Sequence, residues 1–250
     1  METATARPPT PGPDLSALSP DQVERVERLH RDTLIVDALT TSVLDREYAA
    51  VLRAAGVDAT NYTVADTSLS QGQLVQDNFD MACRKIAMWL RLLKDLEDVA
   101  GLATSVADMD SLRAQGRFAV FFGFQNGSPI EDNLDFLDVF HSLGVRFIQL
   151  TYNARNFIGS GSGEREDEGL SDFGIAAVQR MNELGIVVDV SHCGYRTTMD
   201  AITHSSKPVA VTHANMRSLA ATPRNKSDEQ LEALKRNGGI VGVKHMIGDM

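Results

Sequence analysis

The sequence predicts an α/β fold, namely a parallel (β/α)8 barrel of the TIM type. Apolar, strand-like runs alternate with helical patterns, which is typical of parallel βα units. The runs are almost uniformly apolar, as expected for barrel strands that are covered on both sides. A chain of 250 residues with 43% hydrophobic side chains also suits a single large barrel domain. An open, doubly wound sheet is the alternative architecture.

Seven strands are predicted in succession. They span residues 33–39, 57–64, 117–124, 145–152, 186–192, 208–213 and 238–245. An eighth strand would close the ring, but the sequence stops five residues after the seventh. We therefore expect a barrel truncated after strand seven, with the C-terminal part of the domain missing.

Helices are predicted between several of these strands. In residues 77–99, apolar side chains recur at three- and four-residue steps through Ile86 and Leu93. A second helix is expected in 131–144, where Leu134, Leu137, Val139 and Phe140 form the apolar face and Gly144 follows as a C-cap. A third, short helix is expected in 195–205.

Residues 1–22 are predicted to be a disordered, proline-rich tail, and residues 23–250 the barrel domain. The tail holds five of the eight prolines and has neither the basic start nor the apolar core of an export signal. No later apolar run approaches the length of a membrane span. With only two cysteines, Cys83 and Cys193, both thiols are expected to be free. These features favour a cytoplasmic protein.

The charge balance excludes some classes of partner. The chain has 34 acidic and 24 basic residues, a formal net charge of −10, and no block rich in Lys or Arg. Proteins that grip phosphate backbones or anionic lipids are generally basic at the contact. We therefore expect neither a nucleic acid nor a membrane as partner, but a small-molecule substrate.

Two similar phrases, "IVVDVSHCG" and "PVAVTHAN", each end an apolar strand with a histidine. In a parallel barrel the carboxyl ends of neighbouring strands open at one mouth, so His192 and His213 should meet there. Such a pair suggests metal binding or catalysis, although a strand-end histidine can also be a structural, hydrogen-bonded residue. A third phrase, "VGVKH", makes His245 a secondary metal-ligand candidate.

Several motifs in the same order resemble the membrane (renal-type) dipeptidases. They are "FGFQNGSPIEDNLDFLDVFHSLGVRFIQLTYNARN", "GLSDFG", "MNELGIVVDVSH", "VAVTHANMRSL" and "TPRNKSDEQL". That family consists of zinc peptidases with a metal-dependent hydrolase barrel. The resemblance implies that His192 and His213 are zinc ligands. It also implies that Arg224, with Asn225 beside it, holds the substrate or the tetrahedral intermediate, a task that suits a guanidinium.

The sequence departs from the family pattern at other ligand positions. Where the family has Asp-Gly-His-x-Asp after the first strand, residues 37–41 read Asp-Ala-Leu-Thr-Thr, so that Leu39 and Thr41 replace two ligands. Gln125 stands for the bridging glutamate, and Tyr152 stands for a histidine that contacts substrate. Tyr152 is thus a catalytic and substrate-binding candidate, with Asn153 as its neighbour. Asp189 is expected to be a structural carboxylate or one that supports a ligand.

The sequence thus predicts a zinc-dependent, dipeptidase-like hydrolase of dipeptides or related small amides. Two zinc ions need anionic ligands around them, so a single ion is expected, with Gln125 or His245 as a third ligand. Two alternatives stay open: a catalytically inactive binding or regulatory paralogue, and a fragment of a longer enzyme. The resemblance also implies that copies of the chain can associate into a homo-oligomer.

Overall fold

The computed structural model describes residues 16, 18–70 and 73–244, in two compact units, 1–34 and 35–250. The first unit contains helix α1 (Pro20–Asp32). Ser19 and Gln22 start this helix as a capping box, in which Gln22 Oε1 accepts the Ser19 N–H at 2.9 Å. The helix therefore begins inside the range 1–22 predicted for the tail. Residues 1–15 of that tail lie outside the described part.

The second unit is built on a parallel sheet whose order follows the chain. Its main path runs through β1 (Val36–Thr40), β2 (Ala59–Ala65), β6 (Phe118–Phe124), β7 (Val145–Gln149), β8 (Val187–Asp189), β9 (Ala210–Ala214) and β10 (Ile240–Val243). These are the seven predicted strands, so the predicted order is confirmed. A short strand, β5 (Ala100–Leu102), pairs with β6 outside this path and was not predicted.

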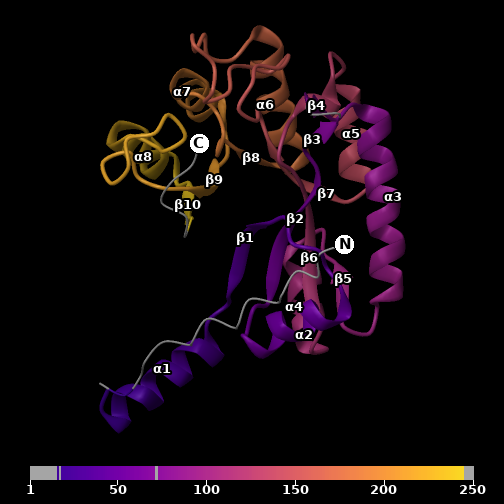
Figure 1. The fold of residues 1–250 in the computed structure, drawn as a ribbon, viewed down its shortest axis with the longest axis vertical. Helices are drawn as coiled ribbons and strands as arrows, with labels where there is room; N and C mark the ends of the chain where they lie inside the picture. The colour runs from indigo at the N-terminus through magenta and orange to yellow at the C-terminus, as the bar shows by residue number, and fades with distance from the viewer. Residues whose placement is uncertain (1–15, 17, 71–72, 245–250) are drawn as a thin grey trace. The chain divides into compact units, whose positions relative to one another are not determined.

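The two ends of the sheet approach each other, so the barrel is nearly closed (Figure 1). A Cβ added to Gly242 of β10 would lie 3.1 Å from Ala38 Cβ of β1. The same Cβ would overlap the carbonyl oxygen of Thr212 on β9, so only glycine fits at this close approach. Because the strands follow chain order and the ends meet, the doubly wound alternative is wrong.

Helices cover the outside of the strands (Figure 1). They are α2 (Arg46–Ala54), α3 (Phe79–Asp95), α4 (Val106–Ala114), α5 (Asp135–Ser142), α6 (Asp172–Leu184), α7 (Tyr195–His204) and α8 (Asp228–Asn237), with a 3-10 turn, η1, at Ser128–Ile130. The three predicted helices correspond to α3, α5 and α7. A hairpin of β3 (Thr67–Ser70) and β4 (Gln73–Gln76) was not predicted.

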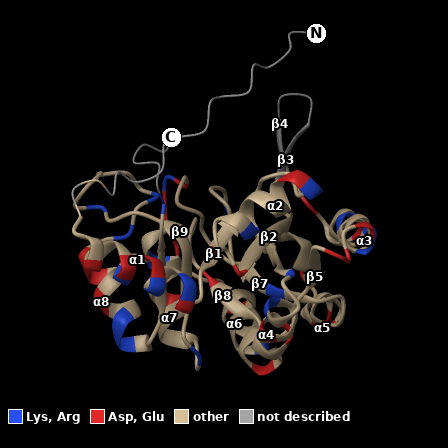
Figure 2. Cartoon of the chain, turned by 90° about the horizontal axis from the view of Figure 1, so that it is seen from below, with Lys and Arg blue, Asp and Glu red and all other residues tan. Residues whose placement is uncertain are grey.

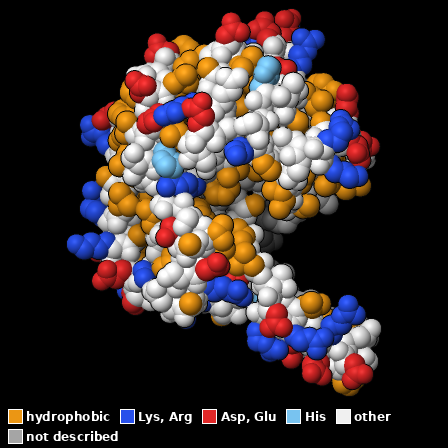
Figure 3. Space-filling model, turned by 180° about the vertical axis from the view of Figure 1, so that it is seen from behind, with side chains coloured by type: hydrophobic (Ala, Val, Ile, Leu, Met, Phe, Trp, Pro, Cys, Tyr) orange, Lys and Arg blue, Asp and Glu red, His pale blue; other side chains and the backbone are white. Residues whose placement is uncertain are grey.

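Large apolar side chains fill the space between strands and helices. Tyr62, Phe122 and Phe140 are fully buried, and the Tyr62 ring lies 4.9 Å from the ring of Trp89 on α3. Val139 of α5 is 40% exposed, which corrects its assignment to the apolar face of that helix. In Figure 2 the charged residues lie mostly on the helices, with both signs interspersed. Acidic and basic side chains are also interspersed on the face seen in Figure 3.

Loops at the carboxyl ends of the strands form one side of the second unit. The long segment 150–171 follows β7, residues 190–194 follow β8, and residues 215–227 follow β9. Because β7, β8 and β9 are consecutive in the sheet, these loops are neighbours. In the described residues, none of the helices has the length and apolar character to cross a membrane.

Candidate active site

His192 and His213 meet at the ends of β8 and β9. Their Nε2 atoms are 3.0 Å apart, and the ring centroids are 5.0 Å apart. His192 is buried and His213 is half-buried. The two rings therefore converge as expected from neighbouring parallel strands, while their role as metal ligands stays a prediction.

Hydrogen bonds on the other ring nitrogens orient both imidazoles. His192 Nδ1 lies 2.8 Å from Asn153 Oδ1, and His213 Nδ1 lies 2.8 Å from Thr212 Oγ1. Thr212 gives its single hydroxyl proton to the carboxylate of Asp189, at 2.6 Å, so its oxygen must accept from the His213 ring. With the Asn153 amide assigned so that its oxygen faces His192, both rings carry their proton on Nδ1.

This arrangement directs two Nε2 lone pairs toward each other. Two lone pairs 3.0 Å apart repel, unless a proton or a cation lies between them. A ring nitrogen fixed by a hydrogen bond on its opposite side is the usual arrangement of histidines that bind metals. The pair is therefore preorganised to share a cation.

Asp189 supports the pair from within the sheet. Its side chain is 2% exposed and accepts hydrogen bonds from the backbone and the hydroxyl of both Ser191 and Thr212. It reaches the His213 ring through Thr212, and Ser191 links it to the His213 backbone N–H. Asp189 is thus a buried, hydrogen-bonded carboxylate, and whether it supports a metal ligand stays a prediction.

His192 is held in its neutral form. Burial, followed by the positive charge of Arg224, keeps the pKa of His192 well below its ordinary value of 6.5. His213, Lys226 and Lys244 add smaller effects in the same direction. Because only neutral imidazole ligates metal or accepts a proton, His192 is ready for either at neutral pH.

Gln125 directly follows β6 and contacts His213 of the histidine pair. Its Nε2 lies 3.3 Å from His213 Nε2. The oxygen and nitrogen of an amide are assigned from their hydrogen-bond partners and can be exchanged by a half-turn of the group. After this rotation, the amide oxygen of Gln125 faces the histidine pair. Three uncharged donors, two imidazoles and one amide, thus converge. His245, the other secondary candidate, lies outside the described residues.

Tyr152 and Asn153 both contact His192. The Tyr152 ring stacks on the imidazole with a centroid distance of 4.1 Å and an interplanar angle of 20°. Asn153 makes the Nδ1 hydrogen bond described above. The structure thus brings both predicted substrate-binding residues to the histidine pair, and their contact with a substrate stays a prediction.

Arg224 and Asn225 lie beneath the pair. The guanidinium of Arg224 is buried and donates to the carbonyl oxygens of Ser191 and His213, the latter at 2.7 Å. Asn225 Oδ1 accepts the Asn215 N–H at 3.2 Å. These bonds hold the ends of the strands in place. The role of both residues in substrate binding stays a prediction.

A cavity of about 600 Å³ opens beside His213. Residues of β1 with the loop after it, together with β9 and β10, line it, including Leu39, Thr41 and Asp37. Burial raises the pKa of the Asp37 carboxyl. Strand alternation places Asp37 on the same side as Leu39, but the sequence did not single it out as a site residue.

Whether the donors at the histidine pair hold one metal ion or two stays a prediction. Among the residues that the structure describes, no group of three or more His, Cys, Asp or Glu side chains could hold a metal. The neutral donors His192, His213 and Gln125 match the three-ligand pattern of a catalytic zinc site, although an amide is a poorer ligand than a carboxylate. Among the described residues, no cluster of carboxylates lies at the pair to hold a second dication.

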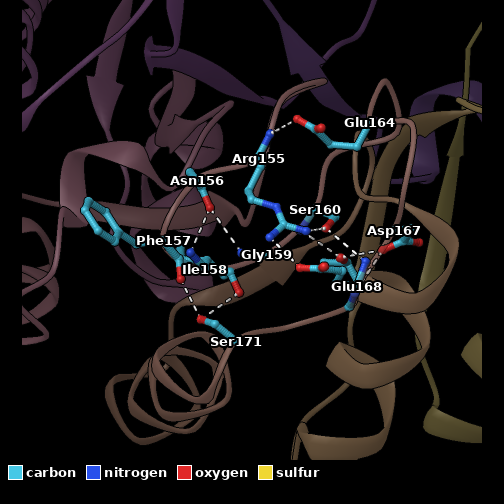
Figure 4. Close-up of polar contacts among 12 residues, drawn as sticks. Arg155, Asn156, Phe157, Ile158, Gly159, Ser160, Glu164, Asp167, Glu168 and Ser171 are labelled. Carbon is cyan, nitrogen blue, oxygen red and sulfur yellow. Dashed lines mark hydrogen bonds and ion pairs between the residues drawn. The ribbon is translucent and has the colours of Figure 1, made fainter.

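The loop after β7 is tied down by ionic and polar bonds that sequence reasoning missed (Figure 4). Arg155 pairs with Glu168 at 2.5 Å, and its backbone N–H donates to Glu164 at 2.6 Å. Farther along, the N–H of Ser162 donates to the carbonyl oxygen of His192 at 2.8 Å. The loop therefore helps to fix His192. The acidic run "EREDE" (164–168) is typical of solvated surface, so no signal in the sequence pointed to this role.

The sequence profile of the membrane dipeptidase family, peptidase family M19, matches residues 24–248. The chain belongs to the membrane dipeptidase family. An uncharacterized dipeptidase of Schizosaccharomyces pombe is 37% identical over 137 residues, which are 53% of this chain and 33% of that protein. Dipeptidase aclJ of Aspergillus oryzae is 31% identical over 177 residues, which are 69% of this chain and 41% of that protein.

A solved structure has a similar fold. An amidohydrolase from Pseudomonas aeruginosa is 36% identical, with a TM-score of 0.80 over 87% of this chain and 64% of that one. This membrane dipeptidase family member therefore spans between a third and two thirds of the length of these relatives.

Proposed function

We propose that the protein is a zinc-dependent, dipeptidase-like hydrolase of dipeptides or related small amides, with one metal ion. The observation that carries this proposal is the facing pair of Nε2 atoms on His192 and His213, 3.0 Å apart. Membership in a family of metallopeptidases and the dipeptidase names of the relatives support the reaction class.

His192, His213 and Gln125 would hold the metal. When bound, zinc lowers the pKa of a water molecule and polarises a carbonyl group. Asn153 and Thr212 orient the two rings, and the stacked ring of Tyr152 shields one face of His192 from solvent. The cavity beside His213 offers space for a small amide.

Metal analysis tests the proposal. Purified wild-type protein should carry about one zinc per chain and hydrolyse members of a dipeptide panel. His192→Ala should lose both properties. His204→Ala serves as the control, because His204 is an exposed residue at the end of α7. Protein that takes up no zinc and shows no hydrolysis after zinc addition would contradict the proposal.

An inactive binding or regulatory paralogue is the second candidate. It is favoured by the uncharged Leu39 and Thr41 that line the cavity where the family has ligands. Calorimetric binding of a dipeptide without turnover, in protein with full zinc content, would select this candidate. Turnover that depends on His192 would exclude it.

For either candidate we propose a cytoplasmic location, which suits the free thiols of Cys83 and Cys193.

A further inference from the structure

Lys226 is a charged side chain enclosed in the protein interior. It follows Asn225 in the loop between β9 and α8, and it is only 2% exposed. Its Nζ donates to the carbonyl oxygen of Cys193 and to Thr198 Oγ1, each at 3.0 Å. Both acceptors are uncharged.

These two contacts reach the turn that carries His192. Cys193 directly follows this histidine, and Thr198 lies in the first turns of α7 and donates to the carbonyl oxygen of Gly194 at 2.7 Å. On the other side of His192, the Ser191 carbonyl oxygen accepts from Arg224. One loop thus holds the main chain on both sides of His192.

The sheet itself gives this turn little support. Strands β8 and β9 are paired at Asp189 and Ala210, and β8 ends at Asp189, three residues before His192. Past this pair, the Val190 N–H donates to the Ala210 carbonyl oxygen at 2.9 Å, and Ser191 Oγ accepts the His213 N–H at 3.1 Å. The Cys193 carbonyl oxygen, one residue past His192, is held by Lys226 from the loop after β9.

Space filling alone does not account for a lysine here. An ammonium group whose two acceptors are neutral loses its hydration, and burial, which outweighs the attraction of Asp189 and Asp167, lowers the pKa of Lys226 to about 8. An apolar side chain of similar length would fill the same volume without this penalty. Functional sites often keep a residue that lowers the stability of the protein, when that residue holds other side chains in the geometry that the function needs.

We propose that Lys226 is a positioning residue, whose bond to the Cys193 carbonyl oxygen sets the place of the His192 ring opposite His213. The inference rests on the proposed function, in which these two rings share a metal ion.

The test compares wild-type protein with Lys226→Met. We expect zinc affinity to fall by about tenfold, the usual effect of losing a bond that supports a ligand. In metal-free protein, the imidazole nitrogen resonances of His192 should shift, while the melting temperature stays equal or rises. Lys207→Met is the control, because Lys207 is exposed and lies just before β9.

Wild-type zinc affinity and wild-type imidazole resonances in Lys226→Met would overturn the inference. So would a lower melting temperature with unchanged resonances, which is the mark of a purely structural lysine. If Lys226→Met does not fold, Lys226→Gln replaces it, because its shorter, neutral side chain withdraws from Cys193. If wild-type protein takes no zinc, the proposed function fails, whereas the metal-free resonances still decide the role of Lys226.

Discussion

At the scale of single residues, the site depends on the atoms behind the two imidazoles. Thr212 links the buried carboxylate of Asp189 to His213 Nδ1. Removing the hydroxyl in Thr212→Val should free the His213 ring to change tautomer, and zinc affinity should fall by about tenfold to a hundredfold. Competition titration against a chromophoric chelator measures this. As the control, Thr203→Val on the exposed side of α7 should bind zinc with the wild-type affinity. Equal zinc affinities in the two variants would contradict the proposed link from Asp189 through Thr212 to His213.

The buried ammonium of Lys226 should make stability depend on pH. Its pKa is 10.5 ordinarily and about 8 in the folded protein, so between these values the unfolded chain binds more protons. The free energy of unfolding therefore rises with pH in this range, by about 3 kcal/mol in total at 1.36 kcal/mol per pKa unit. Below pH 8 the full penalty is present.

Urea unfolding at several pH values tests this linkage. The stability of wild-type protein should increase relative to Lys226→Met between pH 8 and pH 10, because the variant lacks the titrating group. Other groups that titrate in this range contribute equally to the free energy of unfolding of both proteins, so their contributions cancel in the comparison. A difference that stays constant with pH would show that Lys226 has an ordinary pKa.

The sequence predicted the histidine pair but only some of its supports. The repeated strand-then-histidine phrase placed His192 and His213 correctly, because strand ends in a parallel barrel share one mouth. Lys226 gave no such signal, since a lysine in a polar loop is nearly always exposed. Its burial depends on the fold of the loop after β9, which no local pattern specifies.

At the scale of elements, helix α7 begins without a capping side chain of its own. Its N-cap is Gly194, and Asp167 from the loop after β7 replaces the cap by accepting the Arg196 N–H at 2.5 Å. Asp167→Ala should destabilise the protein by about 1 kcal/mol, the usual effect of losing an N-cap. Chemical denaturation measures this, with the exposed neighbour Glu166→Ala as control. Equal stabilities would show that the cap is dispensable.

Strands were predicted more completely than helices. Uniform apolar runs identify buried strands without further context, and all seven were placed in order. Helix α4 was missed because it buries only Met109 and Leu112, which is too few residues to show a helical period. Strand β5 has only three residues and owes its conformation to pairing with β6. Such elements depend on tertiary contacts and not on local pattern.

At the scale of the whole barrel, the approach of β10 to β1 depends on Gly242. A methyl group there would overlap the Thr212 carbonyl oxygen and press on Ala38. Gly242→Ala should therefore destabilise the protein by about 1–3 kcal/mol, as expected for overpacking. Thermal unfolding measures this. Ile240→Ala, at a site that is 71% exposed on the same strand, should have little effect. Similar melting temperatures for both variants would contradict the close packing of β10 against β1.

The proposed zinc site needs His192 and His213 to bind one common ion. X-ray absorption at the zinc edge, measured on protein loaded with the metal, shows which atoms surround the ion. We expect two imidazole nitrogens at about 2.0 Å and no second metal in the spectrum. Absence of imidazole scattering, or a zinc neighbour at about 3.5 Å, would contradict it.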